Sequence, residues 1–291
     1  MTDEIDVTLG IIGGSGLYDL PGLDGTWETI ESPWGTPSDQ VLRGTIEGTK
    51  VVFMPRHRRG HQIPPSDIPF RANIDVMKRA GVTDLVSMSA VGSLKEALAP
   101  GMFVIVDQFI DRTFARAKSF FGEGCVAHVS MAHPVSEQLS GQVEAAAKAT
   151  GVAHAMGGTY LAMEGPQFSS LAESQLYRQW GCDVIGMTNM PEAKLAREAE
   201  ISYATVAMVT DYDSWHPDHG EVDITAIVKV MHENAEAART LVATLAKAMP
   251  ARRSPCPSGA DRALEFAIIT QPDHRDPALV AKLDAIAGRI L

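Results

Sequence analysis

The stretch Val7–Gly16, VTLGIIGGSG, places an apolar run directly before a glycine-rich turn. A strand that enters such a turn often sets backbone N–H groups against a phosphate. That phosphate could belong to a dinucleotide, to a nucleoside triphosphate or to free inorganic phosphate. The turn alone leaves a fourth interpretation equally open, in which it binds no ligand, because a single glycine cluster is a weak signal.

The residues after the turn argue against both nucleotide motifs. The dinucleotide fingerprint G-x-G-x-x-G/A needs a small third residue, and counting from Gly14 places Asp19 there. The next residues contain Pro21, so no helix opens directly onto the turn to hold a pyrophosphate. The triphosphate motif GxxxxGK(S/T) is absent from the sequence. The turn therefore offers backbone N–H groups and one hydroxyl, that of Ser15, to a small anion.

The 291-residue chain is acidic, with 25 Lys and Arg against 36 Asp and Glu and a net charge of −11. This balance disfavours general nucleic-acid binding, which needs a basic surface. Three widely spaced cysteines without a CxxC motif argue against a zinc site and against a disulfide framework. The N-terminus lacks a signal peptide, and no apolar run approaches the ~18 residues of a membrane span. We therefore expect a cytoplasmic protein without a membrane partner.

Apolar strand-like runs alternate with amphipathic helix-like runs before residue 250. Several runs are continuously apolar, which is typical of strands buried on both faces. The alternation predicts one α/β domain with a mostly parallel sheet. The predicted strands are Val7–Ile12, Lys50–Pro55, Asp84–Ala90, Phe103–Val106, Thr159–Met163, Asp183–Met187 and Ser202–Thr210. The predicted helices are Phe70–Arg79, Val135–Ala149, Ser170–Trp180, Glu192–Ala199 and Ile224–Ala248.

The composition changes at Pro250–Asp261, PARRSPCPSGAD, which predicts a connector. We therefore divide the chain into a domain over residues 1–250 and a C-terminal extension over residues 251–291. An amphipathic run, Pro277–Ile290, predicts a helical segment in this extension. The sequence leaves its role open among a packing arm, a lid and a subunit contact.

Groups that can bind an anion follow three of the predicted strands. Arg56 and His57 come directly after Pro55, and a guanidinium is a natural bidentate partner of phosphate. The corresponding residues at the other two strand ends are Ser89, Ala90, Met187 and Thr188. Ligands bind at the carboxyl ends of strands in open parallel sheets, so an anion site is expected here. Each segment taken alone is more often a turn or a helix cap, and Arg58 and Arg59 fit a solvated turn.

Two carboxylates, Asp211 and Asp213, follow a long apolar strand. Their spacing of two residues places both on one side if the chain stays extended. A solvated turn is the simpler interpretation, but the nearby Met208, Tyr212 and Trp215 favour at least one partly buried carboxyl. A buried carboxyl has a raised pKa and can donate a proton near neutral pH.

Taken together and in this order, these stretches resemble the 5′-methylthioadenosine phosphorylase branch of the trimeric purine nucleoside phosphorylases. The motifs that carry the resemblance are GIIGGSG, PRH, SAVGSL, DQFIDRT, MEGPQFSS, GMTNMPEA and VTDYDSW. It extends from about Val7 to about Ala248 and is weak beyond that. The resemblance implies a phosphorylase-like α/β fold with a central mixed, largely parallel sheet surrounded by helices. It also implies a homotrimer and no cofactor or metal.

The resemblance assigns roles to the matching positions. It places phosphate against Ser15, Arg56, His57, Ser89, the Ala90 amide and Thr188. It places the nucleoside against Met187, Phe168, Ser169, Asp211, Tyr212, Asp213, Ile224, Val228 and, from a neighbouring subunit, His128. Among these, Met187 packs on the ribose, and the apolar Ile224 and Val228 line the pocket for a 5′-methylthio group.

The implied reaction is phosphorolysis of a purine thionucleoside by inorganic phosphate, a glycosyl transfer in purine and methionine salvage. Cleavage of the glycosidic bond builds positive charge on the sugar, which a clamped phosphate dianion stabilises and then attacks. Asp211 is the predicted acid at purine N7, and Asp213 is its partner at N6. Related enzymes that use hypoxanthine or guanine carry Asn at the principal base contact, so Asp211 favours 6-aminopurines.

Four other functions stay open at this point. The nearest is a phosphorylase for 6-oxopurine nucleosides or methylthioinosine, which a change of base would distinguish. A hydrolytic nucleosidase would work without phosphate. An NAD-dependent oxidoreductase is suggested by the glycine-rich turn alone, and a non-catalytic nucleoside-binding module would bind without turnover.

Overall fold

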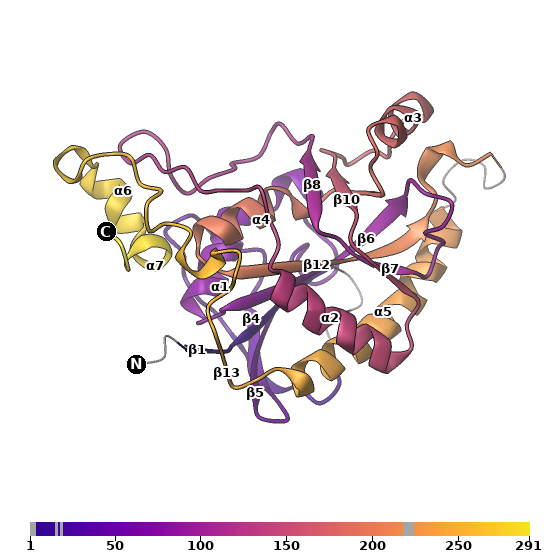
Figure 1. The fold of residues 1–291 in the computed structure, drawn as a ribbon, viewed down its shortest axis with the longest axis horizontal. Helices are drawn as coiled ribbons and strands as arrows, with labels where there is room; N and C mark the ends of the chain where they lie inside the picture. Colours follow the sequence, from indigo (N-terminus) through magenta and orange to yellow (C-terminus); the bar gives the residue numbers. More distant parts are fainter. Residues whose placement is uncertain (1–3, 15–16, 18–19, 218–223) are drawn as a thin grey trace.

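The computed structural model describes residues 4–14, 17, 20–217 and 224–291, with residues 224–226 described by their backbone alone (Figure 1). One sheet of eleven strands forms the centre of this described part. Its order is β3 (Asp24–Glu28), β4 (Val41–Ile46), β5 (Thr49–Pro55), β2 (Leu9–Gly13), β6 (Asp84–Ser93), β11 (Val184–Gly186), β10 (Thr159–Ala162) and β8 (Gln108–Asp111). The other pairs join β12 (Ser202–Asp211) to β6 and to β7 (Phe103–Ile105), and β9 (His154–Met156) to β7.

The sheet is mixed and largely parallel, as the sequence implied. Strand β2 runs parallel to both of its neighbours, β5 and β6, and β12 runs parallel to β6 along most of its length. All five residues of β2 are buried. Leu9 and Ile11 pack in the apolar cluster on one face, and Ile12 packs in the cluster on the other. Cover on both faces explains why this run is apolar throughout instead of alternating.

Helices form a layer on each face of the sheet (Figure 1). Helices α1 (Phe70–Arg79) and α4 (Asn189–Glu198) bury side chains in one cluster. Helices α2 (Glu137–Thr150) and α5 (Ile224–Ala248) bury side chains in the other. Helix α3 (Leu171–Gln179) lies at the periphery (Figure 1). No helix of the described residues is long and apolar enough to cross a membrane.

Every predicted strand and helix is present, with ends shifted by a few residues. Four strands of the sheet, β3, β4, β8 and β9, were not predicted from the sequence. Their hydrophobic signal is weak because they are short or half-exposed: no residue of β3, β8 or β9 is buried. Strand β6 is longer than predicted and continues to Ser93, which places Ser89 within the strand and not at its end.

The C-terminal residues pack against the sheet and its helices. Strand β13 (Arg252–Arg253) pairs with β1 (Ile5–Asp6), and the last helices are α6 (Pro277–Lys282) and α7 (Asp284–Ala287). Leu264, Leu283 and Ile286 are buried in the same apolar cluster as α1 and α4. The division into residues 1–250 and 251–291 stays a prediction, because no comparison with another protein tests it.

A buried ion-pair network joins this C-terminal segment to the sheet. Arg253 lies 2.8 Å from Asp84 at the start of β6 and 2.7 Å from Asp261, and the Arg253 and Asp84 side chains are each 2% exposed. Replacing Arg253 with Ala leaves two buried carboxylates unpaired, so we expect the free energy of unfolding to fall by about 3–5 kcal/mol. The neighbouring Arg252 makes an exposed ion pair with Asp6, and Arg252→Ala is the matched control, with an expected change within about 0.5 kcal/mol. Equal urea-denaturation midpoints for the two variants would contradict this assignment.

Candidate active site

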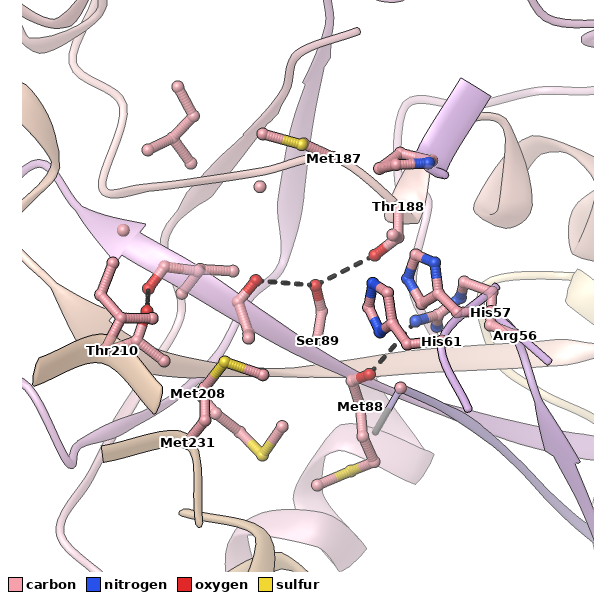
Figure 2. A pocket seen from close by; sticks show the side chains of 18 of the residues that line it. Arg56, His57, His61, Met88, Ser89, Met187, Thr188, Met208, Thr210 and Met231 are labelled. Carbon is pink, nitrogen blue, oxygen red and sulfur yellow. Dashed lines mark hydrogen bonds between the residues drawn. The ribbon is translucent and has the colours of Figure 1, made fainter. Parts of the chain in front are cut away.

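A cavity of about 520 Å³ lies where β5, β6, β11 and β12 meet the first turns of α5 (Figure 2). Its lining includes the predicted residues Arg56, His57, Ser89, Ala90, Phe168, Met187, Thr188, Asp211 and Asp213. Residues from five separate parts of the sequence therefore meet in one place. Strand β11 runs antiparallel to β6. Thr188, two residues beyond the end of β11, therefore lies beside Ser89 in the middle of β6.

Three hydroxyl groups gather at one end of the cavity. The Ser89 hydroxyl oxygen lies 3.1 Å from that of Thr188 (Figure 2). It also lies 3.0 Å from the hydroxyl oxygen of Tyr160. Tyr160 reaches this position because Gly186 has no side chain: a Cβ there would lie 1.9 Å from the Tyr160 hydroxyl oxygen. Ser89 and Thr188, which also line the cavity, can turn their hydroxyl protons toward an anion.

Arg56 adds a fixed positive charge to this end. Its side chain is 1% exposed, and Glu192 of α4 accepts hydrogen bonds from Nε at 2.7 Å and from Nη2 at 3.1 Å. Burial disfavours the charged form, but the Glu192 carboxylate outweighs burial and raises the pKa of Arg56. Nη2 also donates to the Ser87 hydroxyl, whereas Nη1 donates to one carbonyl, that of Met88, at 3.3 Å. Since Nη1 carries two hydrogens, one of them is available to a ligand.

His57 lies beside Arg56 in the turn after β5. Its Nδ1 lies 2.8 Å from the Ile63 carbonyl oxygen, and its ring stacks on that of His61 with centroids 4.4 Å apart. Burial, together with the charge of Arg56, lowers the pKa of His57 to about 4. The ring is therefore neutral at physiological pH.

The two predicted carboxylates lie at the other end of the lining. Strand β12 has an irregularity at Thr210, because Val209 pairs with Val91 whereas Asp211 pairs with Gly92. The Thr210 hydroxyl lies 2.7 Å from Asp211 Oδ2, and Asp211 Oδ1 accepts the backbone N–H of Asp213 at 2.8 Å. Both carboxyls are largely buried, and burial raises the pKa of each.

Asp213 is held differently from Asp211. Its Oδ1 accepts a hydrogen bond from the Ser169 hydroxyl at 3.2 Å, which places the predicted Ser169 next to the site although Ser169 does not line the cavity. Its Oδ2 is buried and is not in good hydrogen-bond geometry with any described donor, although the Ser174 hydroxyl lies close enough to stabilise the charged carboxylate. A buried oxygen of this kind is expected to find a partner in a ligand. Gly92 permits the close approach, since a Cβ there would lie 3.1 Å from the Asp213 Cβ.

Helix α5 and the methionines of the sheet supply the apolar part of the lining. Ile227, Met231 and Ala235 of α5 line the cavity at a spacing of four residues, which keeps them on one helix face. The predicted Val228 is one position out of this phase: its side chain is 45% exposed and is not part of the lining. The side chain of the predicted Ile224 lies outside the described residues, as does Ser15.

Two further predicted residues lie away from the cavity. Tyr212 stacks on His216 with ring centroids 4.6 Å apart, and its hydroxyl donates to the Glu96 carbonyl. His128 is exposed, and its backbone N–H donates to the Ala267 carbonyl. A contact made from a neighbouring subunit by His128 stays a prediction.

Sequence reasoning missed several residues of the lining. The missed residues that carry a polar or sulfur group are His61, Gln62, Met88, Met163, Met208, Thr210, Met231 and Asn234. His61 had a usable signal, because it follows His57 by four residues in the same cationic turn. Within the described part of the chain, no group of three or more His, Cys, Asp or Glu side chains could hold a metal ion.

Comparison with known proteins agrees with this architecture. A family model described as "Phosphorylase superfamily" matches residues 8–247. A Cereibacter sphaeroides protein named S-methyl-5′-thioadenosine phosphorylase is 64% identical over 284 residues, which cover 97% of this chain and 98% of the relative. A Rhodospirillum rubrum protein of the same name is 64% identical over 288 residues, which cover 97% of each chain.

Two solved structures are similar to this chain over most of its length. A crystal structure of a methylthioadenosine phosphorylase from an antarctic soil metagenomic library has a TM-score of 0.88 and 42% identity, and it covers 97% of this chain and 99% of that chain. Methylthioadenosine phosphorylase from Schistosoma mansoni in complex with adenine has a TM-score of 0.79 and 32% identity, over 82% of this chain and 90% of that chain. The family match and these relatives span most of the sequence, and the chain therefore belongs to the phosphorylase superfamily.

Proposed function

We propose that this enzyme cleaves S-methyl-5′-thioadenosine with inorganic phosphate to give adenine and 5-methylthioribose 1-phosphate. One observation carries the proposal: a single cavity joins a buried cluster of Arg56 and hydroxyl groups to a pair of largely buried carboxyls. The first suits an oxyanion, and the second suits a base that must be protonated as it leaves. Relatives that bear the name of this activity are 64% identical over nearly the whole chain.

Phosphate binds at the end formed by Arg56, His57, Ser89, the Ala90 amide and Thr188. The purine binds between Phe168 and the two aspartates, so the sugar lies in the middle, against Met187. Phosphate held there faces the carbon whose bond to the base breaks, which raises its effective concentration. Its negative charge also stabilises the positive charge that develops on the sugar.

Asp211 and Asp213 act on the leaving base. A leaving purine needs a proton at N7, and Asp211, whose pKa is raised by burial, can hold one to a higher pH than an exposed aspartate. The buried Oδ2 of Asp213 can accept the 6-amino N–H of adenine. A 6-oxo group would set two acceptors against each other at this position, which favours adenine over hypoxanthine.

The apolar lining favours a methylthio group at the sugar 5′ position. Ile227 has no hydrogen-bonding group for a 5′-hydroxyl, and the thioether sulfurs of Met208 and Met231 are only weak acceptors. A hydroxyl buried there would lose its bonds to water without replacement. Because Ile227 lines the cavity, it takes the role that the family resemblance assigned to Val228.

Product analysis tests the proposed function directly. With methylthioadenosine we expect adenine release that depends on added phosphate, and with methylthioinosine we expect little turnover. Base release without phosphate would identify a hydrolytic nucleosidase instead. Turnover of methylthioinosine without turnover of methylthioadenosine would identify the 6-oxopurine phosphorylase that was the nearest alternative.

We also propose that the enzyme acts as a cytoplasmic homotrimer without a cofactor, with phosphate as co-substrate. Exposed apolar side chains support a subunit interface, among them Phe114 at 81% and Phe266 at 92% exposed. The acidic composition supports the absence of a nucleic-acid partner.

A further inference from the structure

We propose that His57 is a hydrogen-bond acceptor that recognises the protonated oxygen of the bound phosphate and so selects a protonated oxyanion over a fully ionised one. This inference rests on the proposed function, because it takes phosphate as the ligand at the Arg56 end of the cavity. It assigns His57 a specificity role for the co-substrate beyond simple attraction of an anion.

The hydrogen bond of Nδ1 decides the tautomer of His57. Nδ1 lies 2.8 Å from the Ile63 carbonyl oxygen, and a carbonyl oxygen can only accept, so Nδ1 carries the proton. In a neutral imidazole the other nitrogen, Nε2, then has a lone pair and no hydrogen. The adjacent Cδ2 faces the cavity residue Gly14, since a Cβ on Gly14 would lie 3.8 Å from it. Nε2 is therefore the nitrogen left for a ligand.

The charges around the ring keep it neutral before a ligand binds. Arg56 precedes it in the chain, and His61 stacks on it from the same turn (Figure 2). Glu192, from α4, is bound to Arg56, and Asp211 and Asp213 lie at the purine end. Among the described residues, no carboxylate accepts a hydrogen bond from the His57 ring, so none favours its protonation. Burial and the Arg56 charge accordingly lower its pKa to about 4.

The other side chains of this subsite can each donate a hydrogen bond, and the Ser89 hydroxyl, which donates to the Ala90 carbonyl at 3.3 Å, can turn toward a ligand instead. Arg56 has an Nη1 hydrogen to give, and Ser89 and Thr188 can each give a hydroxyl proton. A phosphate dianion has three bare oxygens and one P–OH group, which fits several donors and one acceptor. A sulfate dianion has four bare oxygens, so one of them would set a lone pair against Nε2 unless His57 first takes up a proton.

The two anions are therefore expected to respond differently to pH. We would measure dissociation constants for phosphate and for sulfate by calorimetry on the full-length enzyme, between about pH 8 and 9, where phosphate is a dianion. Sulfate binding requires one added proton, so its dissociation constant should rise about tenfold per pH unit, while that of phosphate stays nearly constant. The heat of sulfate binding should also vary with the ionisation enthalpy of the buffer, and that of phosphate should not.

Variants test whether His57 causes the difference in pH dependence between phosphate and sulfate binding. His57→Gln supplies a side-chain amide that can donate, so the pH dependence of sulfate affinity should disappear and the preference for phosphate should fall about tenfold near pH 8.5. Arg59→Gln, which changes an exposed cation of the same turn outside the cavity lining, is the matched control and should keep the pH dependence of both dissociation constants seen in the parent enzyme. Two results would overturn this inference and leave the proposed function intact. One is an equal pH dependence of the phosphate and sulfate dissociation constants in the parent, and the other is an unchanged pH dependence of the sulfate dissociation constant in His57→Gln. Failure of the parent to bind phosphate and to use it in turnover would overturn the proposed function itself.

Discussion

Replacing Arg56 with Met should lower kcat/KM for phosphate by about 10²–10³-fold or more, because the change removes the buried guanidinium charge at the phosphate end of the cavity. The KM for methylthioadenosine should change much less, since Arg56 lies away from the carboxyl pair. Initial rates at varied phosphate, with the nucleoside saturating, provide the measurement. Unchanged phosphate dependence would refute the placement of phosphate.

The same substitution also tests how Arg56 is held. Glu192 would stay buried, with the Tyr203 hydroxyl at 2.9 Å as its remaining hydrogen-bond donor in the described structure, and breaking a buried ion pair costs about 3–5 kcal/mol of unfolding free energy. The double variant Arg56→Met/Glu192→Gln removes both charges. It should recover most of the stability and none of the phosphate dependence, which separates folding from chemistry.

Arg59 provides the matched control within the same turn. It is also a cation, but its side chain is 44% exposed and pairs with Asp39. Arg59→Met should leave the phosphate kinetics unchanged and shift the free energy of unfolding by no more than about 1 kcal/mol. An equal loss of activity in Arg56→Met and Arg59→Met would indicate a general electrostatic effect instead of a specific contact.

Asp211→Asn should lower kcat/KM for methylthioadenosine by about 10²–10⁴-fold, the range typical for loss of a general acid. The amide keeps the size of the carboxyl but cannot deliver a proton to N7. It can donate an N–H to an oxo group, so the ratio of methylthioinosine to methylthioadenosine turnover should rise. Competition between the two substrates measures this ratio, and an unchanged ratio with full activity would contradict the assigned role.

The pH profile gives a second test of Asp211. Burial raises its pKa, so it remains protonated at a higher pH than an ordinary aspartate and loses its proton as the pH rises through that value. Activity that depends on the protonated acid should therefore fall on the alkaline side. Asp211→Asn should lack this decline, whereas Arg59→Met should retain it.

Much of the architecture could be predicted from local pattern. The buried parallel strands have continuous apolar runs, and the residues that follow them come together because those strands meet in one region of the sheet. Short exposed strands such as β3 were missed, since none of its residues is buried and no apolar run or alternation marks it. Glu192 was missed for another reason: its partner Arg56 lies 136 residues away, and sequence alone does not show which distant charges are buried together.

The rotation of helix α5 about its axis set a further limit on what could be predicted from the sequence. The sequence predicted that the start of α5 lines the pocket, and the structure places this helix there. Choosing Ile227 instead of Val228 depends on the rotation of α5 about its axis, which is fixed by packing of residues such as Leu241 and Val242 much later in the helix. A one-residue error corresponds to about 100° around the helix.

The irregular pairing of β12 with β6 shows that the number of residues in β12, and not only their identity, decides which way Asp211 points. Thr210 is one residue more than β6 can match, and side chains alternate between the faces of a strand. Without that extra residue the alternation would turn Asp211 to the opposite face. Under the proposed function, recognition of adenine would depend on this insertion as well as on the carboxylate. Two relatives could then share both aspartates and still differ in base preference if one of them lacked the insertion.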